Sequence, residues 1–259
     1  MEELLDNFDK FCFDKNLFEI RDKVLDNNRI DINDALNIMA TNDINSLGQL
    51  AAYKKNQLHG RKVYFVVNRH INPTNVCAIS CKFCAFGKPK GSKDAYEMSM
   101  DKILSLVNDE LKEIHIVGGL HPDWEFEKYL NIVREVSKAA PKSHIKAFTA
   151  VEIDWFSQIS GKPVSEVVSS LMDAGVDALP GGGAEIFAPE VRKKICSPKT
   201  TGDSWLEVHR EAHKLGMPSN ATILYGHLES DHDVVDHLNK LRSLQDDTNG
   251  FFAFIPVLF

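Results

Sequence analysis

Apolar residues in the first sixty positions recur at intervals typical of helices. The leucine, isoleucine and valine side chains between residues 17 and 25 fall at helical spacing, and residues 31–34 offer polar N-cap candidates for a second helix. A third helix is predicted over residues 44–55. These positions carry no recognisable chemistry, so we predict an N-terminal helical segment, residues 1–60, that packs on the domain after it.

Strand-like and helix-like patterns alternate after residue 60. Apolar, β-branched runs predict six strands, at residues 63–67, 113–117, 145–149, 178–179, 219–224 and 250–256. Amphipathic stretches predict helices between them, at residues 98–108, 129–138, 164–174, 205–215 and 234–244. Successive β–α units form a parallel sheet through right-handed crossovers. We therefore predict an α/β domain over residues 61–259 without an internal linker.

Composition and charge narrow the classes of function. The chain has 259 residues and a formal net charge of −7, which disfavours the basic face that nucleic acid requires. The basic run at residues 88–93 is interpreted as a solvated loop. No apolar run approaches the roughly 20 residues that cross a bilayer, and the acidic N-terminus is unlike a signal peptide. We predict a cytoplasmic protein that binds neither nucleic acid nor membrane.

Three of the five cysteines lie close together, as Cys77-x3-Cys81-x2-Cys84. Thiolate selects zinc, copper(I) or iron–sulfur clusters, so this crowding predicts a metal centre. A structural zinc site needs four protein ligands, and only the isolated Cys12 and Cys196 remain. Most iron–sulfur cubes also take four cysteines, so a cube held by three would leave one iron open to a substrate.

Other candidate site residues follow predicted strands, where the loops of a parallel barrel converge. Gly118 and Gly119 let a ligand approach the backbone. The glycine triplet 181–183 precedes Glu185, whose carboxylate suits ribose hydroxyls or an ammonium group, and Arg192 is a candidate partner for a carboxylate. Further candidates are Thr149 and Asn220 for cofactor binding, and Glu152, Tyr225 and His227 for catalysis.

The cysteine spacing resembles the cluster-binding motif of the radical S-adenosylmethionine (radical SAM) enzymes. The resemblance implies a 4Fe–4S cluster on the three cysteines, with SAM bound at the open iron and cleaved by one electron to a 5′-deoxyadenosyl radical. It implies that Phe83 packs near adenine and that Gly118 and Gly119 receive the amino group of the methionine part. It also implies a partial (β/α)6 barrel, in agreement with the six predicted strands.

Longer stretches resemble one family within this superfamily, the aminofutalosine synthases. They lie at residues 70–77, 83–87, 116–122, 147–153, 180–187, 192–196 and 220–227. The resemblance implies that the deoxyadenosyl radical adds to the enolpyruvyl ether of 3-hydroxybenzoate, giving 6-amino-6-deoxyfutalosine for menaquinone biosynthesis. It implies SAM as a co-substrate and an electron donor such as flavodoxin or ferredoxin. The two carboxylates of the substrate require cationic partners, for which Arg69, His70 and Arg192 are candidates.

The family continues well past residue 259. The apolar run at residues 251–259 would leave an uncapped strand at the chain end, which is unusual for a natural terminus. We therefore expect a sequence truncated at its C-terminus, without some of the substrate contacts.

Other interpretations stay open. Dehypoxanthine futalosine cyclase and the FO synthases share parts of these motifs and use the radical differently. A non-catalytic iron–sulfur or zinc-binding module, completed by His70 or Cys196, would also explain the cysteines. His209 and His213 have the spacing of helical metal ligands, but Arg210 replaces the glutamate of the zinc-protease motif, and we interpret them as solvated helix surface.

Overall fold

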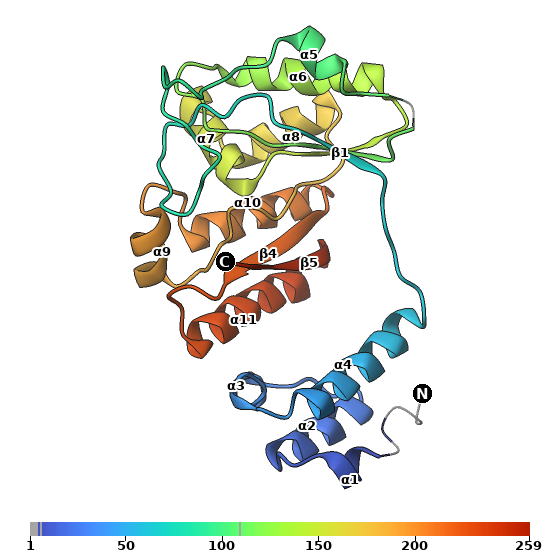
Figure 1. Ribbon diagram of the computed structural model, residues 1–259. Helices are drawn as coiled ribbons and strands as arrows, with labels where there is room; N and C mark the ends of the chain where they lie inside the picture. Colours follow the sequence, from blue (N-terminus) through green and yellow to red (C-terminus); the bar gives the residue numbers. More distant parts are fainter. Residues whose placement is uncertain (1–4, 6, 109) are drawn as a thin grey trace. The chain divides into compact units, whose positions relative to one another are not determined.

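A computed structural model describes residue 5 and residues 7–108 and 110–259 (Figure 1). Its contacts divide the chain into two compact units. One comprises the residues up to 65 together with 230–235, and the other comprises residues 66–229 and 236–259. The second unit contains all the candidate site residues named above.

Helices build the first unit. They are α1 (Phe8–Phe11), α2 (Asn16–Leu25), α3 (Ile32–Ala40) and α4 (Ile44–His59). Their apolar core comprises Phe8, Leu17, Ile20 and Leu50. The Asp31 side chain accepts hydrogen bonds from the N–H groups of Asn33 and Asp34, so α3 begins at the expected polar cap. The predicted helices are confirmed, and their packing on the barrel stays a prediction.

Parallel strands frame the second unit. In one sheet β1 (Asn68–Ile71), β2 (Glu113–Ile116) and β3 (His144–Ala147) pair in that order. In a second sheet β4 (Ser219–Tyr225) pairs with β5 (Phe251–Leu258). Isolated parallel bridges from Lys146 to Ala178 and from Leu179 to Ser219 connect the two sheets. Six strand positions thus follow one another, which confirms the predicted α/β fold of the partial (β/α)6 barrel type.

Helices connect these strands along the chain. They are α5 (Met100–Leu104), α6 (Phe126–Ala139), α7 (Ala150–Ser160), α8 (Val164–Ala174), α9 (Pro189–Cys196), α10 (Gly202–Lys214) and α11 (Asp231–Thr248). The hydrophobic pattern does not predict α7 or α9. The residues at the start of α7 are mostly buried, so this helix lacks a clear polar face in its sequence. The helix α9 is only eight residues long, too short for a clear periodic pattern. α5 begins after Ser99, whose side chain accepts a hydrogen bond from the N–H of Lys102, and it is shorter than predicted.

The first strand lies later in the chain than predicted. Residues 63–67 lie outside the strands, and the side chain of Phe65 is 92% exposed. Branched and aromatic residues fit a pleated surface only where a neighbouring strand covers them, so composition alone does not make a strand. Pairing with β2 begins at Asn68, and Ile71 is the buried residue of β1. The prediction of a strand at 63–67 is therefore wrong.

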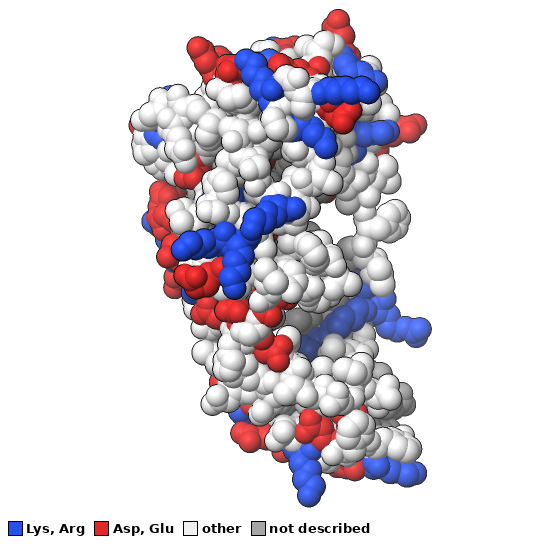
Figure 2. Space-filling model, turned by 60° about the vertical axis from the view of Figure 1, so that its left-hand side comes forward, with Lys and Arg blue, Asp and Glu red and all other residues white. Residues whose placement is uncertain are grey.

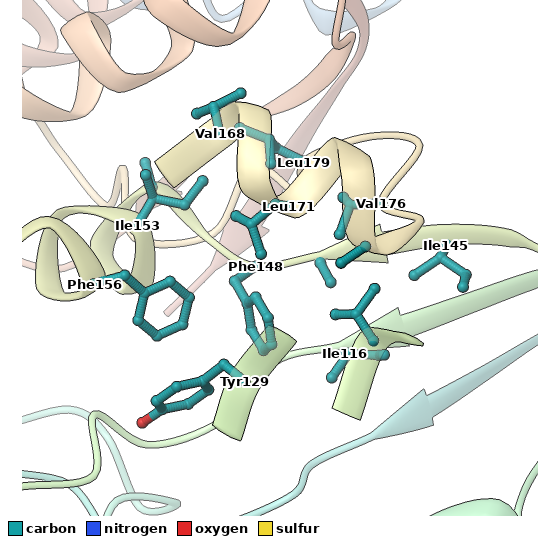
Figure 3. Packing of buried hydrophobic residues seen from close by; sticks show 14 of the residues in the cluster. Ile116, Tyr129, Ile145, Phe148, Ile153, Phe156, Val168, Leu171, Val176 and Leu179 are labelled. Carbon is teal, nitrogen blue, oxygen red and sulfur yellow. The ribbon is translucent and has the colours of Figure 1, made fainter. Parts of the chain in front are cut away.

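The main apolar core covers one face of the three-stranded sheet. Alternate strand residues point into it, namely Ile71, Ile114, Ile116, Ile145 and Ala147. Phe148 continues this core between aromatic rings of α6 and α7, with centroid distances of 5.6 Å to Tyr129 and 5.0 Å to Phe156 (Figure 3). The packed face anchors the strands, so that the segments after their C-terminal ends start from a rigid edge.

Charged side chains of both signs share the surface. On the face that Figure 2 presents, acidic side chains lie next to the basic ones. Among the helices of the described residues, none is both long and apolar enough to span a bilayer.

His209 and His213 lie inside the second unit. The Ser219 Oγ lies 2.7 Å from Nδ1 of His209 and 2.7 Å from Nε2 of His213, whose Nδ1 lies 2.7 Å from Thr248 Oγ1. Burial, and to a smaller extent the neighbouring His213, holds the pKa of His209 well below its usual value; burial lowers the pKa of His213 to about 4. The interpretation as solvated helix surface is wrong, because these imidazoles join α10 to β4 and α11.

We predict that the second unit loses stability in acid as these imidazoles protonate. Their pKa values are lower in the folded than in the unfolded chain, so their contribution is complete above about pH 6.5 and is lost as the pH falls towards 4. In urea unfolding across this range, His213→Gln should flatten the pH dependence by up to about 1.4 kcal/mol per pH unit. His232→Gln, at an exposed histidine, is the control. Equal slopes for the wild type and His213→Gln would contradict the prediction.

Candidate active site

A cavity of about 580 Å³ lies beyond the C-terminal ends of the first strands. Its wall includes Asn72 after β1, residues 117–120 after β2, Thr149 after β3 and Gly183 after the bridge at Leu179. Residues 77–81, Cys84 and residues 86–89 contribute most of the remaining wall. The volume suits a small-molecule ligand. The predicted convergence of strand-end segments is present in this part of the barrel.

The three clustered cysteines all line this cavity as free thiols. A Cβ atom added to Gly87 would lie 3.8 Å from the Sγ of Cys84 and 3.9 Å from that of Cys77, so these two sulfurs flank one point of the chain. Burial raises the pKa of Cys81 to about 11. Metal binding would require the thiolate form, which the positive charge of Lys199 favours. The donor set therefore fits a soft metal centre.

Three cysteines on one wall are an incomplete ligand set for zinc and could hold three irons of a cluster. Among the described residues, no group of three or more His, Cys, Asp or Glu side chains converges tightly enough to hold one metal ion. Zinc would need four ligands around one point. A 4Fe–4S cube binds each cysteine through a different iron, so its cysteine sulfurs lie farther apart than the ligands of one ion.

Backbone hydrogen bonds hold the cysteine loop in place. The N–H of Cys77 donates to the Lys88 carbonyl at 2.9 Å, and the N–H of Ala78 donates to the Leu120 carbonyl at 2.8 Å. The N–H of Lys82 donates to the Ile195 carbonyl of α9 at 2.9 Å. The loop therefore keeps its shape through contacts with the segment after β2 and with α9.

Gly118 and Gly119 allow the end of β2 to meet the cysteine loop. A Cβ atom at Gly119 would lie 2.2 Å from the carbonyl oxygen of Val76, and one at Gly118 would lie 3.0 Å from that of Thr74. Both glycines also line the cavity. They serve the close approach of two backbones, and the same absence of side chains leaves the cavity wall open to a ligand.

Glu152 joins three segments at the cavity. Its Oε1 accepts a hydrogen bond from the N–H of Gly118 at 2.8 Å. Its Oε2 accepts from the N–H and the hydroxyl of Thr149 at 2.8 and 2.7 Å, and these two residues form the capping box that starts α7. Burial raises the pKa of Glu152 to about 7, although the three donors favour the ionised form. The carboxylate positions the ends of β2 and β3, and both Glu152 and Thr149 line the cavity.

Lys199 is one of two lysines of the cavity wall, together with Lys88. Its Nζ lies 2.5 Å from Oε1 of Glu185 and 5.4 Å from the ring centroid of Phe83. Burial alone would lower the pKa of Lys199, but the negative charge of Glu185 and its hydrogen bond raise the pKa. Lys199 therefore stays charged at neutral pH. Glu185 and Phe83 contact this lysine and lie outside the cavity lining.

Arg192 is engaged elsewhere. Its guanidinium is buried and donates to the carbonyls of Ala184, Ile186, Gly183 and Thr200. These bonds fold the segment after the glycine triplet onto the segment that carries Lys199. Arg192 does not line the cavity, so the geometry gives this residue the role of shaping the loop.

Three more candidates lie outside the cavity lining. Asn220 is 5% exposed, and its side-chain oxygen has no hydrogen-bond partner among the described residues. Nε2 of His227 lies 3.0 Å from the carbonyl oxygen of Leu224, and its Nδ1 lies 3.0 Å from a Glu229 oxygen, so the imidazole is held within a turn. Tyr225 is 38% exposed at the end of β4. Catalytic roles for Tyr225 and His227 stay predictions without a contact to the cavity.

Sequence reasoning did not identify Lys199. The residue stands in a short polar stretch after α9, and nothing in its spacing distinguishes it from Lys193 or Lys194. One signal was present: Glu185 was expected to bind an ammonium group. The structure supplies that group from the chain itself.

Comparison with known proteins gives a match over most of the chain. Residues 71–241 match the family model of the Radical SAM superfamily. The chain is 43% identical to an aminodeoxyfutalosine synthase from Thermus thermophilus, over 95% of this chain and 67% of the relative. It is 42% identical to an aminodeoxyfutalosine synthase from Streptomyces coelicolor, over 92% of this chain and 63% of that one. The chain thus spans about two thirds of the length of these relatives.

A solved structure shows the same fold. HydG, a maturase of the FeFe-hydrogenase, superposes with a TM-score of 0.71 and 16% sequence identity. The alignment covers 99% of this chain and 57% of the HydG chain. The similarity concerns the fold.

We predict that Gly119→Ala disrupts the cysteine loop. The new methyl group would meet the Val76 carbonyl at 2.2 Å, directly before Cys77, and backbone atoms cannot rotate away as a flexible side chain can. We expect destabilisation of roughly 1–3 kcal/mol in urea unfolding and a lower iron content after anaerobic reconstitution. Gly48→Ala is the matched control, since no atom lies within 4 Å of its added Cβ. Normal stability and iron content in Gly119→Ala would contradict the prediction.

Proposed function

The chain belongs to the radical SAM superfamily, and from this premise we propose that it carries the radical SAM domain of an aminodeoxyfutalosine synthase. The proposed reaction joins the adenosyl part of SAM to the enolpyruvyl ether of 3-hydroxybenzoate and yields 6-amino-6-deoxyfutalosine. The observation that carries this proposal is the 43% identity to a synthase over 95% of the chain. The cavity lined by the cysteine triplet supports it independently of sequence similarity.

Members of the superfamily use a 4Fe–4S cluster and SAM. When bound, the cluster supplies the electron that cleaves a carbon–sulfur bond of SAM. Cys77, Cys81 and Cys84 are the residues that would hold three irons of the cluster. The backbone of Gly118 and Gly119 forms the neighbouring wall, where a ligand meets no side chain.

Lys199 is proposed to bind the carboxylate of the cofactor's methionine part. The sequence analysis predicted Arg192 for this role, but its guanidinium donates hydrogen bonds to backbone carbonyls. Lys199 lies on the cavity wall and has three N–H donors, of which the ion pair with Glu185 uses one. A charged donor in a partly enclosed site forms a stronger hydrogen bond to a carboxylate than a neutral donor does.

The chain also has to hold the radical close to the substrate and to exclude water from the cavity. Glu152 and Thr149 fix the ends of β2 and β3, so the cavity wall moves little. A radical must meet its target bond before it meets solvent, which requires near-attack distance and exclusion of water. We further propose a cytoplasmic location and a flavodoxin or ferredoxin as the electron donor, because a reduced cluster needs both a reducing compartment and a supply of single electrons.

We predict that Cys81→Ala abolishes both cluster and reaction. Reconstituted wild-type protein, incubated anaerobically with SAM, reductant and the enolpyruvyl ether, should release an adenosylated product of the mass of 6-amino-6-deoxyfutalosine. Cys81→Ala should show no cluster absorption and no product, whereas Cys12→Ala, a cysteine of the helical unit, should match the wild type. Wild-type release of 5′-deoxyadenosine without the adduct would contradict the synthase assignment, and zinc without sulfide would contradict the radical SAM activity.

We predict that removing the Lys199 charge weakens SAM binding. The single substitution Lys199→Met would leave the buried Glu185 carboxylate without its ion-pair partner. The test therefore uses the double variant Lys199→Met/Glu185→Gln. A charged hydrogen bond contributes about 1.5–3 kcal/mol, so the dissociation constant of SAM for the cluster-loaded protein should rise roughly tenfold or more. Lys194→Met, at an exposed lysine of α9, should leave it unchanged. Wild-type affinity in the double variant would exclude the role.

A further inference from the structure

A group of polar side chains occupies the inner face of the three-stranded sheet. His70 of β1, His115 of β2 and Lys146 of β3 stand in register across adjacent strands. Nε2 of His115 lies 2.5 Å from Oε1 of Glu113, and Nζ of Lys146 lies 2.7 Å from Oε2 of the same carboxylate. The ring centroids of His70 and His115 are 4.6 Å apart. We call these four residues the lumen cluster.

The cluster faces away from the apolar core. The neighbouring residues of the same strands, Ile114, Ile116 and Ile145, belong to that core, and successive strand residues point to opposite faces. Lys146 also lies 4.6 Å from the ring centroid of Phe252 in β5, a strand of the other sheet. A side chain of β3 reaches β5 only across the inside of the partial barrel. Glu113 and Lys146 therefore lie inside the barrel, whereas the side chain of His70 is exposed.

Folding alone gives no reason for this composition. Lys146 is 6% exposed and Glu113 is 8% exposed, and a buried ion pair is often no more stable than apolar residues of similar volume. The opposite face of β2 and β3 uses isoleucine and alanine, and that of β1 has the exposed Arg69 beside the buried Ile71. Ser219 contacts His209 and Ala221 belongs to the apolar core, so Asn220 between them points to the inner face. The side-chain oxygen of Asn220 has no hydrogen-bond partner among the described residues. A polar interior of this kind points to a polar ligand.

The cluster adjoins the cavity. Asn72 and Val117 line the cavity, and they stand two residues beyond His70 and His115, on the same face of the chain. Two residues of a strand span roughly 6.6 Å, a distance that one substituted benzene ring can bridge. A ligand fixed at the cluster would thus extend towards the cysteine side of the cavity.

We propose that the lumen cluster binds an aromatic carboxylate, with Lys146 as its anion-binding group. Lys146 has three N–H donors, and its one ion-pair partner among the described residues is Glu113, so donors remain for a ligand. The ring of Phe252 and the imidazoles of His70 and His115 offer flat faces on which an aromatic ring can stack. The identification of this ligand with the benzoate part of the substrate rests on the proposed function. The binding of an aromatic carboxylate does not.

The test measures benzoate binding to the cluster-loaded protein by titration calorimetry. Glu113→Gln removes the competing negative charge and keeps Lys146, so we expect the dissociation constant of benzoate to fall about tenfold. The double variant Lys146→Met/Glu113→Gln removes both charges together and so avoids an unpaired buried ion. It should raise the dissociation constant of benzoate at least tenfold relative to the wild type. Lys142→Met, at an exposed lysine before β3, is the control and should match the wild type. Neutral benzamide should bind all four proteins alike.

The outcomes separate this inference from the proposed function. No benzoate binding to the wild type, or equal binding by the wild type and the double variant, would overturn the lumen site. Thermal unfolding checks that the double variant is folded. If it is not folded, Glu113→Gln still tests the site, because this variant should bind benzoate more tightly than the wild type. If the adenosylated product forms while these variants leave benzoate binding unchanged, the lumen site alone fails. If benzoate binding responds as expected and no adduct forms, the synthase assignment alone fails.

Discussion

The carboxylate of Glu152 is the contact on which the cavity depends. It accepts hydrogen bonds from Gly118 after β2 and from Thr149 after β3, and it belongs to the first turn of α7. Parallel strands deliver their C-terminal ends to one edge, but the segments beyond them need a common partner to stay there. A buried carboxylate with three donors supplies it. The cysteine loop then packs on the fixed segment through Gly119 and the Leu120 carbonyl.

The arrangement of charges divides the cavity region into two parts. Near the cysteines, Lys199 is held by Glu185 and faces the cavity. Inside the barrel, Lys146 is held by Glu113 and contacts Phe252. Each lysine is partly neutralised by one glutamate, so each remains a donor to an anion without leaving an isolated charge in the protein interior. Two such sites match a reaction that brings together a cofactor carboxylate and a substrate carboxylate.

The residue pattern predicted the fold class, because it depends on local features, and the metal site stays a prediction from the cysteine spacing. The cysteine spacing, the Gly118-Gly119 pair and the helical periods are readable along the chain. The Thr149-x-x-Glu152 pattern is also the signature of a capping box, which predicts the start of α7 and was overlooked in favour of a ligand-binding role. Residues 63–67 failed as a strand because strand formation depends on a partner that composition does not specify.

Partners formed across the fold could not be read from the chain. Arg192 and Lys199 are both cations after the glycine triplet, and only the path of residues 183–200 decides which one meets carbonyls and which one meets the cavity. The same holds for Glu113, His115 and Lys146, whose alternation with isoleucine marks one polar face without saying whether solvent or a barrel interior lies there. The contact of Lys146 with Phe252 decides it, because it places the second sheet opposite the polar face of β3. A polar face that needs no explanation in solvent needs one where Glu113 and Lys146 are buried, and the proposed ligand supplies it.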